Sequence, residues 1–232
     1  KKLKIMLHHE ISGNGKKPLV LLHGFMENTT IWDEMEAHLS KDFTLIKIDL
    51  PGHGKSKVYQ EIHTVELMAE KVKEVIDALK LEKINLLGHS LGGYVSLAFA
   101  ENFPEILESM TLFFSTTVAD DEEKKAIRRR SIAVIDENFE TFVKTSIPNL
   151  FSNNEKDILE GKIELAKNIA KSTDKEGVKA AQLGMAERPD RTEILENLDA
   201  KILIIAGKYD NAVKTENLLK IIPEKTNIKT YV

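Results

Sequence analysis

A serine stands between two glycines directly after an apolar run, and this pattern constrains the fold more than any other feature of the chain. The run Ile84–Leu87 leads into Gly88-His89-Ser90-Leu91-Gly92, the pattern of a tight turn between a strand and a helix that holds a serine hydroxyl out for attack. Glycines two positions either side of Ser90 let the strand and the helix approach each other closely. Residues 94–100 then predict a buried helix, whose amino end would favour negative charge at Ser90.

The composition predicts an ordinary globular protein in which serine is the available nucleophile. With 232 residues the chain can bury one sizeable core, and 42% hydrophobic with 30% charged residues argues against disorder. The chain has no cysteine, which excludes disulfides, thiolate catalysis and cysteine-ligated zinc. A formal charge of -4 offers no basic surface to nucleic acid, and no apolar run is long enough to span a bilayer.

The amino terminus lacks the long apolar region of a secretory signal, so we expect a cytoplasmic protein, either a monomer or a homodimer. The first residue is Lys1 rather than methionine, which leaves open that a targeting segment precedes it.

Short apolar runs alternate with helical spacing along the first half of the chain. The predicted strands are 4–11, 18–22, 43–50, 84–88 and 110–114, and the predicted helices are 31–39, 65–79 and 94–100. Continuous apolar runs are typical of strands that are buried on both faces, so the alternation predicts a mostly parallel sheet with helices on both faces. Thr64 is the expected N-cap of the second helix. Ligands gather at the carboxyl ends of such strands, where His23, Asp49 and Ser90 fall.

The alternation stops between residues 117 and 192. This stretch predicts amphipathic helices over 122–135, 139–144, 155–171 and 175–187. The sheet pattern resumes at 202–210, followed by a helix near 214–222 and a last strand over 228–232. We therefore expect a core formed by 1–116 and 193–232, with 117–192 inserted as a helical lid.

Three further segments fall at strand ends in the same order as in a known family. They are Leu21-Leu22-His23-Gly24-Phe25, Asp49 to Ser56, and Ala206-Gly207-Lys208-Tyr209-Asp210. With the serine turn they resemble the alpha/beta-hydrolase superfamily, in particular the serine esterase-like branch that includes the biotin-pathway carboxylesterase and bacterial carbon-carbon bond hydrolases. The resemblance covers the chain except for the insertion. It implies an α/β-hydrolase fold with a helical lid.

The resemblance also implies roles for four residues. Ser90 matches the nucleophile that attacks an acyl carbon and forms a covalent intermediate. The backbone N–H groups of Phe25 and Leu91 match the two donors of an oxyanion hole. Asp210 matches the carboxylate that orients a catalytic histidine.

Residues around the insertion leave alternatives open. Asp120 is a second candidate for the acid, although the acidic residues beside it favour a helix start. The run Arg128–Arg130 either meets an anionic substrate or lies in solvent. Several apolar side chains either line an acyl pocket or pack in a core. These are Phe25, Met26, Phe139, Phe142, Leu150, Phe151 and Met185.

The general base is missing from the pattern. In the family it follows the last strand, whereas all seven histidines lie at or before His89. We interpret His23 and His53 as structural, and His89 as pointing away from the serine. The remaining histidines, which we expect at the surface or an edge, are His8, His9, His38 and His63. We expect the C-terminal part of the protein, with its catalytic histidine, to lie beyond Val232, and the chain as given to be inactive.

The expected function is a serine hydrolase that acts on a small carboxylic ester or thioester through an acyl-enzyme at Ser90. A serine at this turn argues against epoxide hydrolases and haloalkane dehalogenases, which use aspartate. A carbon-carbon bond hydrolase, a menaquinone-pathway-like lyase and a ligand-binding relative without turnover remain alternatives. The expected partner is a small acyl substrate, with no cofactor, metal, nucleic acid or membrane.

Overall fold

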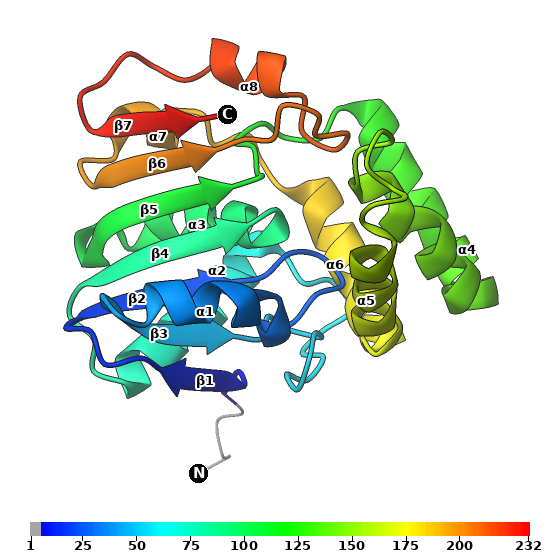
Figure 1. Cartoon of the computed structure of the whole chain (residues 1–232), viewed down its shortest axis with the longest axis horizontal. Helices are drawn as coiled ribbons and strands as arrows, with labels where there is room; N and C mark the ends of the chain where they lie inside the picture. The colour runs from blue at the N-terminus through cyan, green and yellow to red at the C-terminus, as the bar shows by residue number, and fades with distance from the viewer. Residues whose placement is uncertain (1–5) are drawn as a thin grey trace.

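Seven strands form one sheet in the order β1-β3-β2-β4-β5-β6-β7 within residues 6–232, which the computed structural model describes (Figure 1). The strands are β1 (His9–Ser12), β2 (Lys17–Leu22), β3 (Phe43–Ile48), β4 (Ile84–His89), β5 (Leu107–Phe113), β6 (Lys201–Ile205) and β7 (Ile228–Tyr231). β1 pairs antiparallel with β3, and every other neighbouring pair in this sheet is parallel. The predicted α/β class with a mostly parallel sheet is confirmed.

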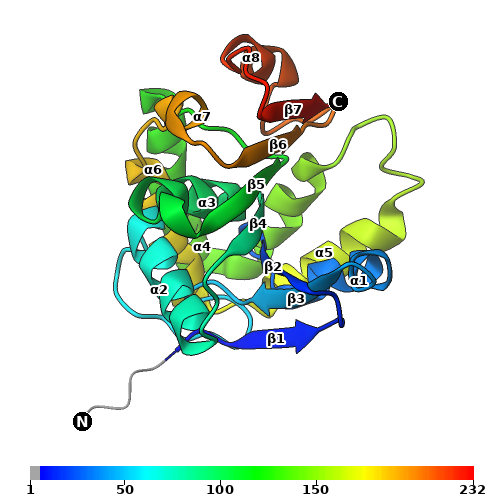
Figure 2. The same cartoon turned by 90° about the vertical axis from the view of Figure 1, so that its left-hand side faces the viewer.

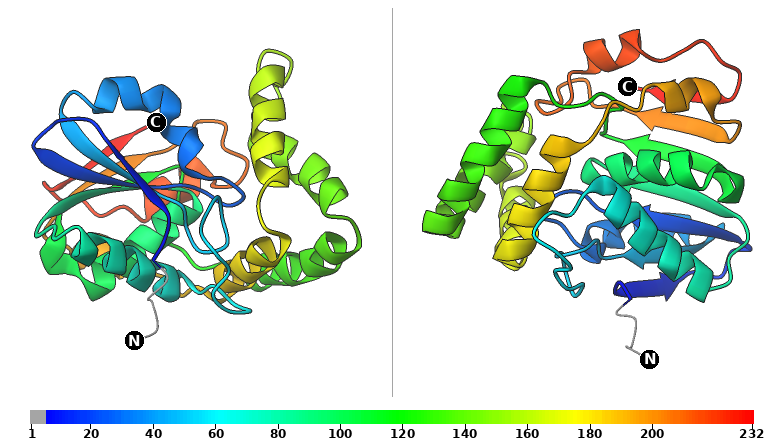
Figure 3. Two further views of the ribbon diagram at one scale, coloured as in Figure 1. Left: turned by 90° about the horizontal axis from the view of Figure 1, so that it is seen from below. Right: turned by 180° about the vertical axis from the view of Figure 1, so that it is seen from behind.

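Helices cover both faces of the sheet. They are α1 (Asp33–Leu39), α2 (Val65–Ala78), α3 (Leu91–Asn102), α7 (Glu193–Asn197) and α8 (Thr215–Lys220). Figure 2 shows α2, α3 and α7 on one face and α1 on the other, and the rear view in Figure 3 shows α2 and α3 lying over the sheet. Alternate residues of β2 explain the two layers, because Val20 and Leu22 pack with the α2–α3 core while Leu19 and Leu21 pack with Trp32.

The helix α2 shows how the sequence sets an element. Its N-cap is Thr64, which has an extended backbone and whose side chain accepts a hydrogen bond from the N–H of Leu67 at 3.1 Å. Apolar residues at helical spacing are fully buried against the sheet and α3. These are Val65, Met68, Ala69, Val72, Val75 and Ile76. The predicted cap and buried face are both confirmed.

The segment between β5 and β6 holds three long helices, α4 (Glu122–Ser146), α5 (Glu160–Lys171) and α6 (Lys175–Glu187). In Figure 1 they lie beside the carboxyl ends of the parallel strands. α4 is kinked at Asn138, whose φ of -154° and ψ of 89° are not helical. This kink corresponds to the predicted break between 135 and 139. α5 begins at Glu160 instead of the predicted residue 155.

The helix α6 is attached to the core more closely than the rest of the insertion. Its residues Ala181 and Met185 belong to the main apolar core, and the N–H of His63 donates to the carbonyl of Ala180 at 3.0 Å. α4 and α5, together with Val178 of α6, build a second apolar cluster around Ile135 and Met26. The proposed lid over 117–192 is therefore joined to the core along its last helix.

The two ends of the sheet differ slightly from the predictions. β1 begins at His9, and positions 4 and 5 of the predicted first strand lie outside the described residues. β6 ends at Ile205, so residues 206–210 form a loop instead of continuing the strand. Within residues 6–232, no helix is long and apolar enough to cross a membrane.

Candidate active site

Ser90 occupies the strained turn that the sequence predicted. β4 ends at His89 and α3 begins at Leu91, and Ser90 between them has a φ of 49° and a ψ of -109°. A side chain held at positive φ costs about 1–3 kcal/mol, so the surrounding structure must hold it in place. The N–H of Ser90 donates to the carbonyl of Phe113 at 3.0 Å, and the Ser90 carbonyl accepts from Ser115 Oγ at 2.8 Å.

The two glycines of the turn are needed because backbone crosses backbone there. A Cβ on Gly88 would lie 2.2 Å from the carbonyl oxygen of Gly92, and a Cβ on Gly92 would lie 2.2 Å from that of Leu22. Both distances are far shorter than any real contact. The turn thus fixes Ser90 against the end of β2 as well as against α3.

The two backbone N–H groups predicted as oxyanion donors lie on either side of the close approach between the end of β2 and the start of α3. Leu91 is the first residue of α3, so its N–H has no partner inside the helix. Phe25 follows β2 by three residues, and Leu22 at the end of β2 is in register with Gly88. The two candidate donors therefore belong to neighbouring strand ends.

A contact between Glu27 and His89, which the sequence analysis missed, joins these same two strand ends. Glu27 Oε2 lies 2.9 Å from His89 Nδ1 and accepts the N–H of Gly24 at 2.5 Å. Burial works against the charge on both side chains, but each partner outweighs it, so that the pKa of Glu27 is lowered and that of His89 is raised. Nothing local marks Glu27, because 62 residues separate the partners.

His23 and His53 are buried and hydrogen-bonded to the backbone, as a structural role requires. His23 Nε2 accepts the N–H of Leu50 at 2.9 Å, and its Nδ1 lies 2.7 Å from the carbonyl of Gly24. His53 Nδ1 lies 3.0 Å from the carbonyl of Pro51. Burial lowers the pKa of His23 to about 4 and that of His53 to about 3, so both imidazoles are neutral at pH 7.

The expectation that His63 lies at the surface or an edge is wrong. His63 is fully buried, and its Nε2 accepts the N–H of Tyr59 at 3.1 Å. The docking of α6 causes this burial, because Gly184 of that helix touches the backbone of His63. Burial also lowers the pKa of His63.

Acid should destabilise the protein through the buried histidines. The folded-state pKa values of His23 and His53, about 4 and about 3, lie below the ordinary 6.5. As the pH falls below 6.5, the unfolded chain therefore binds protons first. Their stabilising contribution is complete above pH 6.5, and by pH 5 it falls by about 2 kcal/mol for each histidine. Urea unfolding from pH 7.5 to 4.5 measures this loss. His53→Gln should flatten the slope, and an equally steep slope in that variant would contradict the assignment.

Asp210 lies in the loop after β6, with its side chain half-buried. Its Oδ1 accepts the N–H groups of Ala212 at 2.7 Å and Val213 at 2.9 Å, and Oδ2 accepts no hydrogen bond within the described part of the chain. The carboxylate is near enough to His89 to favour the charged imidazole. A polar hollow of about 260 Å³ adjoins it, lined by Ser152, Asn153, Asn154, Tyr209, Asp210 and Asn211.

Asp120, the alternative acid, is held by arginines instead. It accepts hydrogen bonds from Arg128 Nε at 2.5 Å and Arg188 Nη2 at 2.9 Å, and its side chain is 1% exposed. Burial opposes ionisation, but the two arginines hold the pKa of Asp120 below its usual value. Arg128 thus points inward to a carboxylate, whereas Arg129 and Arg130 are exposed.

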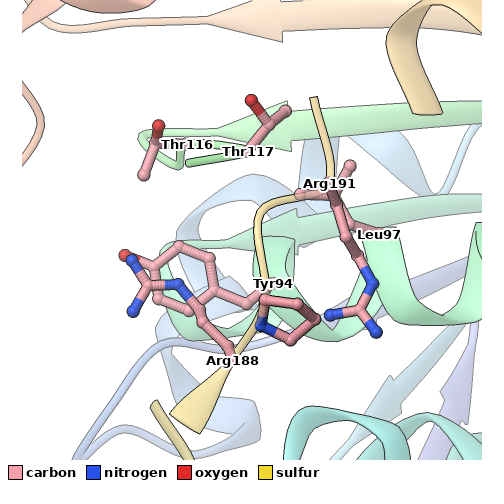
Figure 4. Close-up of a pocket in the computed structure, with 7 residues that line it drawn as sticks. Tyr94, Leu97, Thr116, Thr117, Arg188 and Arg191 are labelled. Carbon is pink, nitrogen blue, oxygen red and sulfur yellow. The ribbon is translucent and has the colours of Figure 1, made fainter. Parts of the chain in front are cut away.

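Arg188 also lines a small cleft (Figure 4). Its guanidinium lies over the ring of Tyr94, 4.0 Å from the centroid. The cleft has a volume of about 10 Å³ and is lined by Tyr94, Leu97, Thr116, Thr117, Arg188, Pro189 and Arg191. This is room for a single water molecule at most, so the cleft holds no organic substrate.

The apolar side chains that were candidates for an acyl pocket divide into three groups. Met26, Phe142 and Met185 are buried in apolar cores, which is the packing interpretation. Leu150 is exposed. The half-buried aromatic residues packed against the second cluster are Phe25, Phe139 and Phe151, and these remain candidates for contact with a substrate.

The chain matches known proteins along nearly its whole length. The alpha/beta hydrolase fold family matches residues 17–231. A thermophilic esterase from Thermogutta terrifontis, solved with malate bound, is 32% identical with a TM-score of 0.88, covering 97% of this chain and 84% of that one. A putative 2-succinyl-6-hydroxy-2,4-cyclohexadiene-1-carboxylate synthase of Bacillus subtilis is 28% identical over 85% of this chain and 75% of its own length.

A shorter match covers about half of the chain. An uncharacterized protein of Mycobacterium tuberculosis is 34% identical over 111 residues, which are 48% of this chain but only 32% of that protein. The chain thus matches about a third of such a relative. The family match over residues 17–231 agrees with the seven-stranded sheet and with the strained serine at the end of β4. The chain therefore belongs to the alpha/beta hydrolase fold family.

Proposed function

We propose that the protein is a serine hydrolase that cleaves a small carboxylic ester or thioester. The observation that carries the proposal is the conformation of Ser90, which is held at positive φ between β4 and the amino end of α3. A strained backbone conformation is maintained where it serves a function, and this one presents a hydroxyl at the end of a buried strand. The similarity to an esterase at 32% identity supports the same reaction class.

The proposed reaction has two steps. Ser90 Oγ attacks the acyl carbon, its proton passes to a base, and the alcohol or thiol leaves with a proton as the acyl-enzyme forms. Water then attacks the acyl-enzyme and releases the acid. The N–H groups of Phe25 and Leu91 stabilise the negative oxygen of each tetrahedral intermediate, and one such donor contributes about 3 kcal/mol.

None of the buried or paired histidines in the described part of the chain is placed to act as the general base that accepts the proton of Ser90. His23, His53 and His63 are buried and hydrogen-bonded to the backbone. His89 is paired with Glu27 and shares no hydrogen bond with Ser90 within residues 6–232. We place the base on a histidine beyond Val232, oriented by Asp210, and the 232-residue chain should be nearly inactive without it.

Exogenous imidazole tests the proposal on this chain, because it can take the proton that the absent histidine would accept. We expect the hydrolysis of p-nitrophenyl acetate to rise with imidazole, to saturate with ester, and to exceed the rate of imidazole alone. In the presence of imidazole, a fluorophosphonate should label the peptide that contains Ser90. A folded protein that shows neither effect would contradict the proposal and favour a ligand-binding relative.

One observation favours a second candidate, a lyase of the menaquinone pathway. The putative synthase of Bacillus subtilis described above is 28% identical to the chain over 85% of the chain's length. A lyase would form 2-succinyl-6-hydroxy-2,4-cyclohexadiene-1-carboxylate from its precursor without an acyl-enzyme. Formation of that product, without imidazole-dependent ester turnover, would replace the first proposal.

A further inference from the structure

The carboxylate of Glu27 touches both loops that form the candidate oxyanion hole. One oxygen, Oε2, accepts the N–H of Gly24 at 2.5 Å and contacts His89 Nδ1 at 2.9 Å. Gly24 precedes Phe25, and His89 precedes Ser90 and Leu91. We propose that Glu27 is a positioning residue, which ties the loop after β2 to the serine turn and so sets the separation of the two oxyanion donors. This inference rests on the proposed hydrolase function.

The contacts around Gly24 determine which way the Phe25 N–H points. The carbonyl of Gly24 and the N–H of Phe25 belong to one trans peptide unit, so they point in opposite directions. That carbonyl is held by His23 Nδ1 at 2.7 Å and by the N–H of Glu27 at 3.3 Å. The Glu27 carboxylate holds the preceding peptide through the Gly24 N–H. Both peptides next to the Gly24 Cα are thereby fixed.

Glu27 and His89 also fill the space next to the Cα of Gly24. A Cβ on Gly24 would lie 2.7 Å from Glu27 Oε2 and 2.8 Å from His89 Nδ1. The absence of a side chain at this position lets the carboxylate and the imidazole meet directly over the backbone.

The pair lies where an ionic hydrogen bond is strong. Both side chains are 25% exposed, and contacts between charged groups that are partly shielded from water are stronger than neutral ones. Other charged or titratable groups act on the pair. Asp210 favours the charged form of His89, and His23 acts on Glu27. Losing the carboxylate would leave the His89 ring without its direct partner.

A small shift of one donor should reduce transition-state stabilisation while leaving ground-state binding almost unchanged. Misplacement by about 1 Å can cost about a hundredfold in rate. We therefore expect Glu27→Ala to lower kcat about 10- to 100-fold in the imidazole-supported reaction, with KM changed less than about twofold. Glu27→Gln should retain most of kcat, because one amide oxygen can accept both contacts.

Two further variants complete the kinetic test. His89→Ala removes the contact between Glu27 and His89 but leaves the hydrogen bond from the Gly24 N–H to Glu27 in place. Its kcat should therefore fall less than that of Glu27→Ala. Glu61→Ala, at an exposed position in another loop, should behave as wild type. Wild-type kcat in Glu27→Ala, or equal losses in Glu27→Ala and Glu27→Gln, would overturn the inference.

Amide hydrogen exchange provides a readout that does not depend on activity. In Glu27→Ala, peptides that contain Gly24 and Phe25 should exchange about tenfold faster, and Glu27→Gln should restore most of the protection. Unchanged exchange in Glu27→Ala would contradict the proposal that Glu27 holds the loop after β2 in place. If wild type shows no turnover, the proposed function fails, and the exchange comparison still decides whether Glu27 holds the loop.

Discussion

Ser90→Ala will abolish covalent labelling by a fluorophosphonate and reduce imidazole-supported ester hydrolysis to the rate of imidazole alone. The substitution removes the one atom that forms the ester bond to the acyl group. It leaves the backbone contacts of the turn in place, because residue 90 makes them through its N–H and carbonyl. Initial rates and intact mass after labelling measure both effects.

A second serine at the turn provides the matched control. Ser115 Oγ donates to the carbonyl of Ser90 at 2.8 Å and holds the backbone from outside the reaction. Ser115→Ala should therefore still be labelled at Ser90, with a lower melting temperature because a partly buried hydrogen bond is lost. Labelling that persists in Ser90→Ala would identify another nucleophile and contradict the role of Ser90.

The features that could be predicted from the sequence are those that depend on neighbours in the chain. Continuous apolar runs gave β2, β3 and β4 to within two residues at each end. Thr64 marked the start of α2, and the loss of apolar spacing near Asn138 marked the kink of α4. The turn at Ser90 was recognisable because its two glycines reflect a local steric need.

The side-chain pairs and the buried histidine that could not be predicted all depend on contacts between segments that are distant in the sequence. Glu27 and His89 are 62 residues apart, and Asp120 and Arg188 are 68 apart. Neither pair has a periodicity that would indicate it. α6 docks on the backbone of buried His63, and the pattern of α6 does not specify which loop it covers.

The helical insertion between β5 and β6 also depends on contacts between distant segments that its sequence does not reveal. Its helices were predictable from amphipathic spacing, but their attachment was not. The apolar faces of α4 and α5 close on each other, on Met26 and on Val178 of α6, while Ala181 and Met185 of α6 enter the main core. A division at 117 and 192 follows the sequence pattern, whereas the packing makes α6 the link between the second apolar cluster and the main core.

The contact between Gly184 of α6 and the backbone of His63 should be important for stability. Gly184→Ala should destabilise the protein by about 3 kcal/mol, because overpacking at a rigid contact forces backbone to move. A Cβ on Gly184 would lie 1.8 Å from the carbonyl oxygen of His63 and 3.0 Å from the nitrogen of Thr64. Both are backbone atoms next to the N-cap of α2, so no side-chain rotation relieves the clash. Urea unfolding followed by far-ultraviolet circular dichroism measures the loss.

Gly161→Ala is the matched control, since it makes the same substitution in α5 where no atom lies within 4 Å of the new Cβ. It should stabilise the protein by about 0.5–1 kcal/mol, because alanine loses less conformational entropy than glycine in a helix. Equal stability of Gly184→Ala and wild type would show that α6 yields to the clash and moves independently of the core. A single cooperative transition at lower urea would instead show that α6 unfolds together with the sheet.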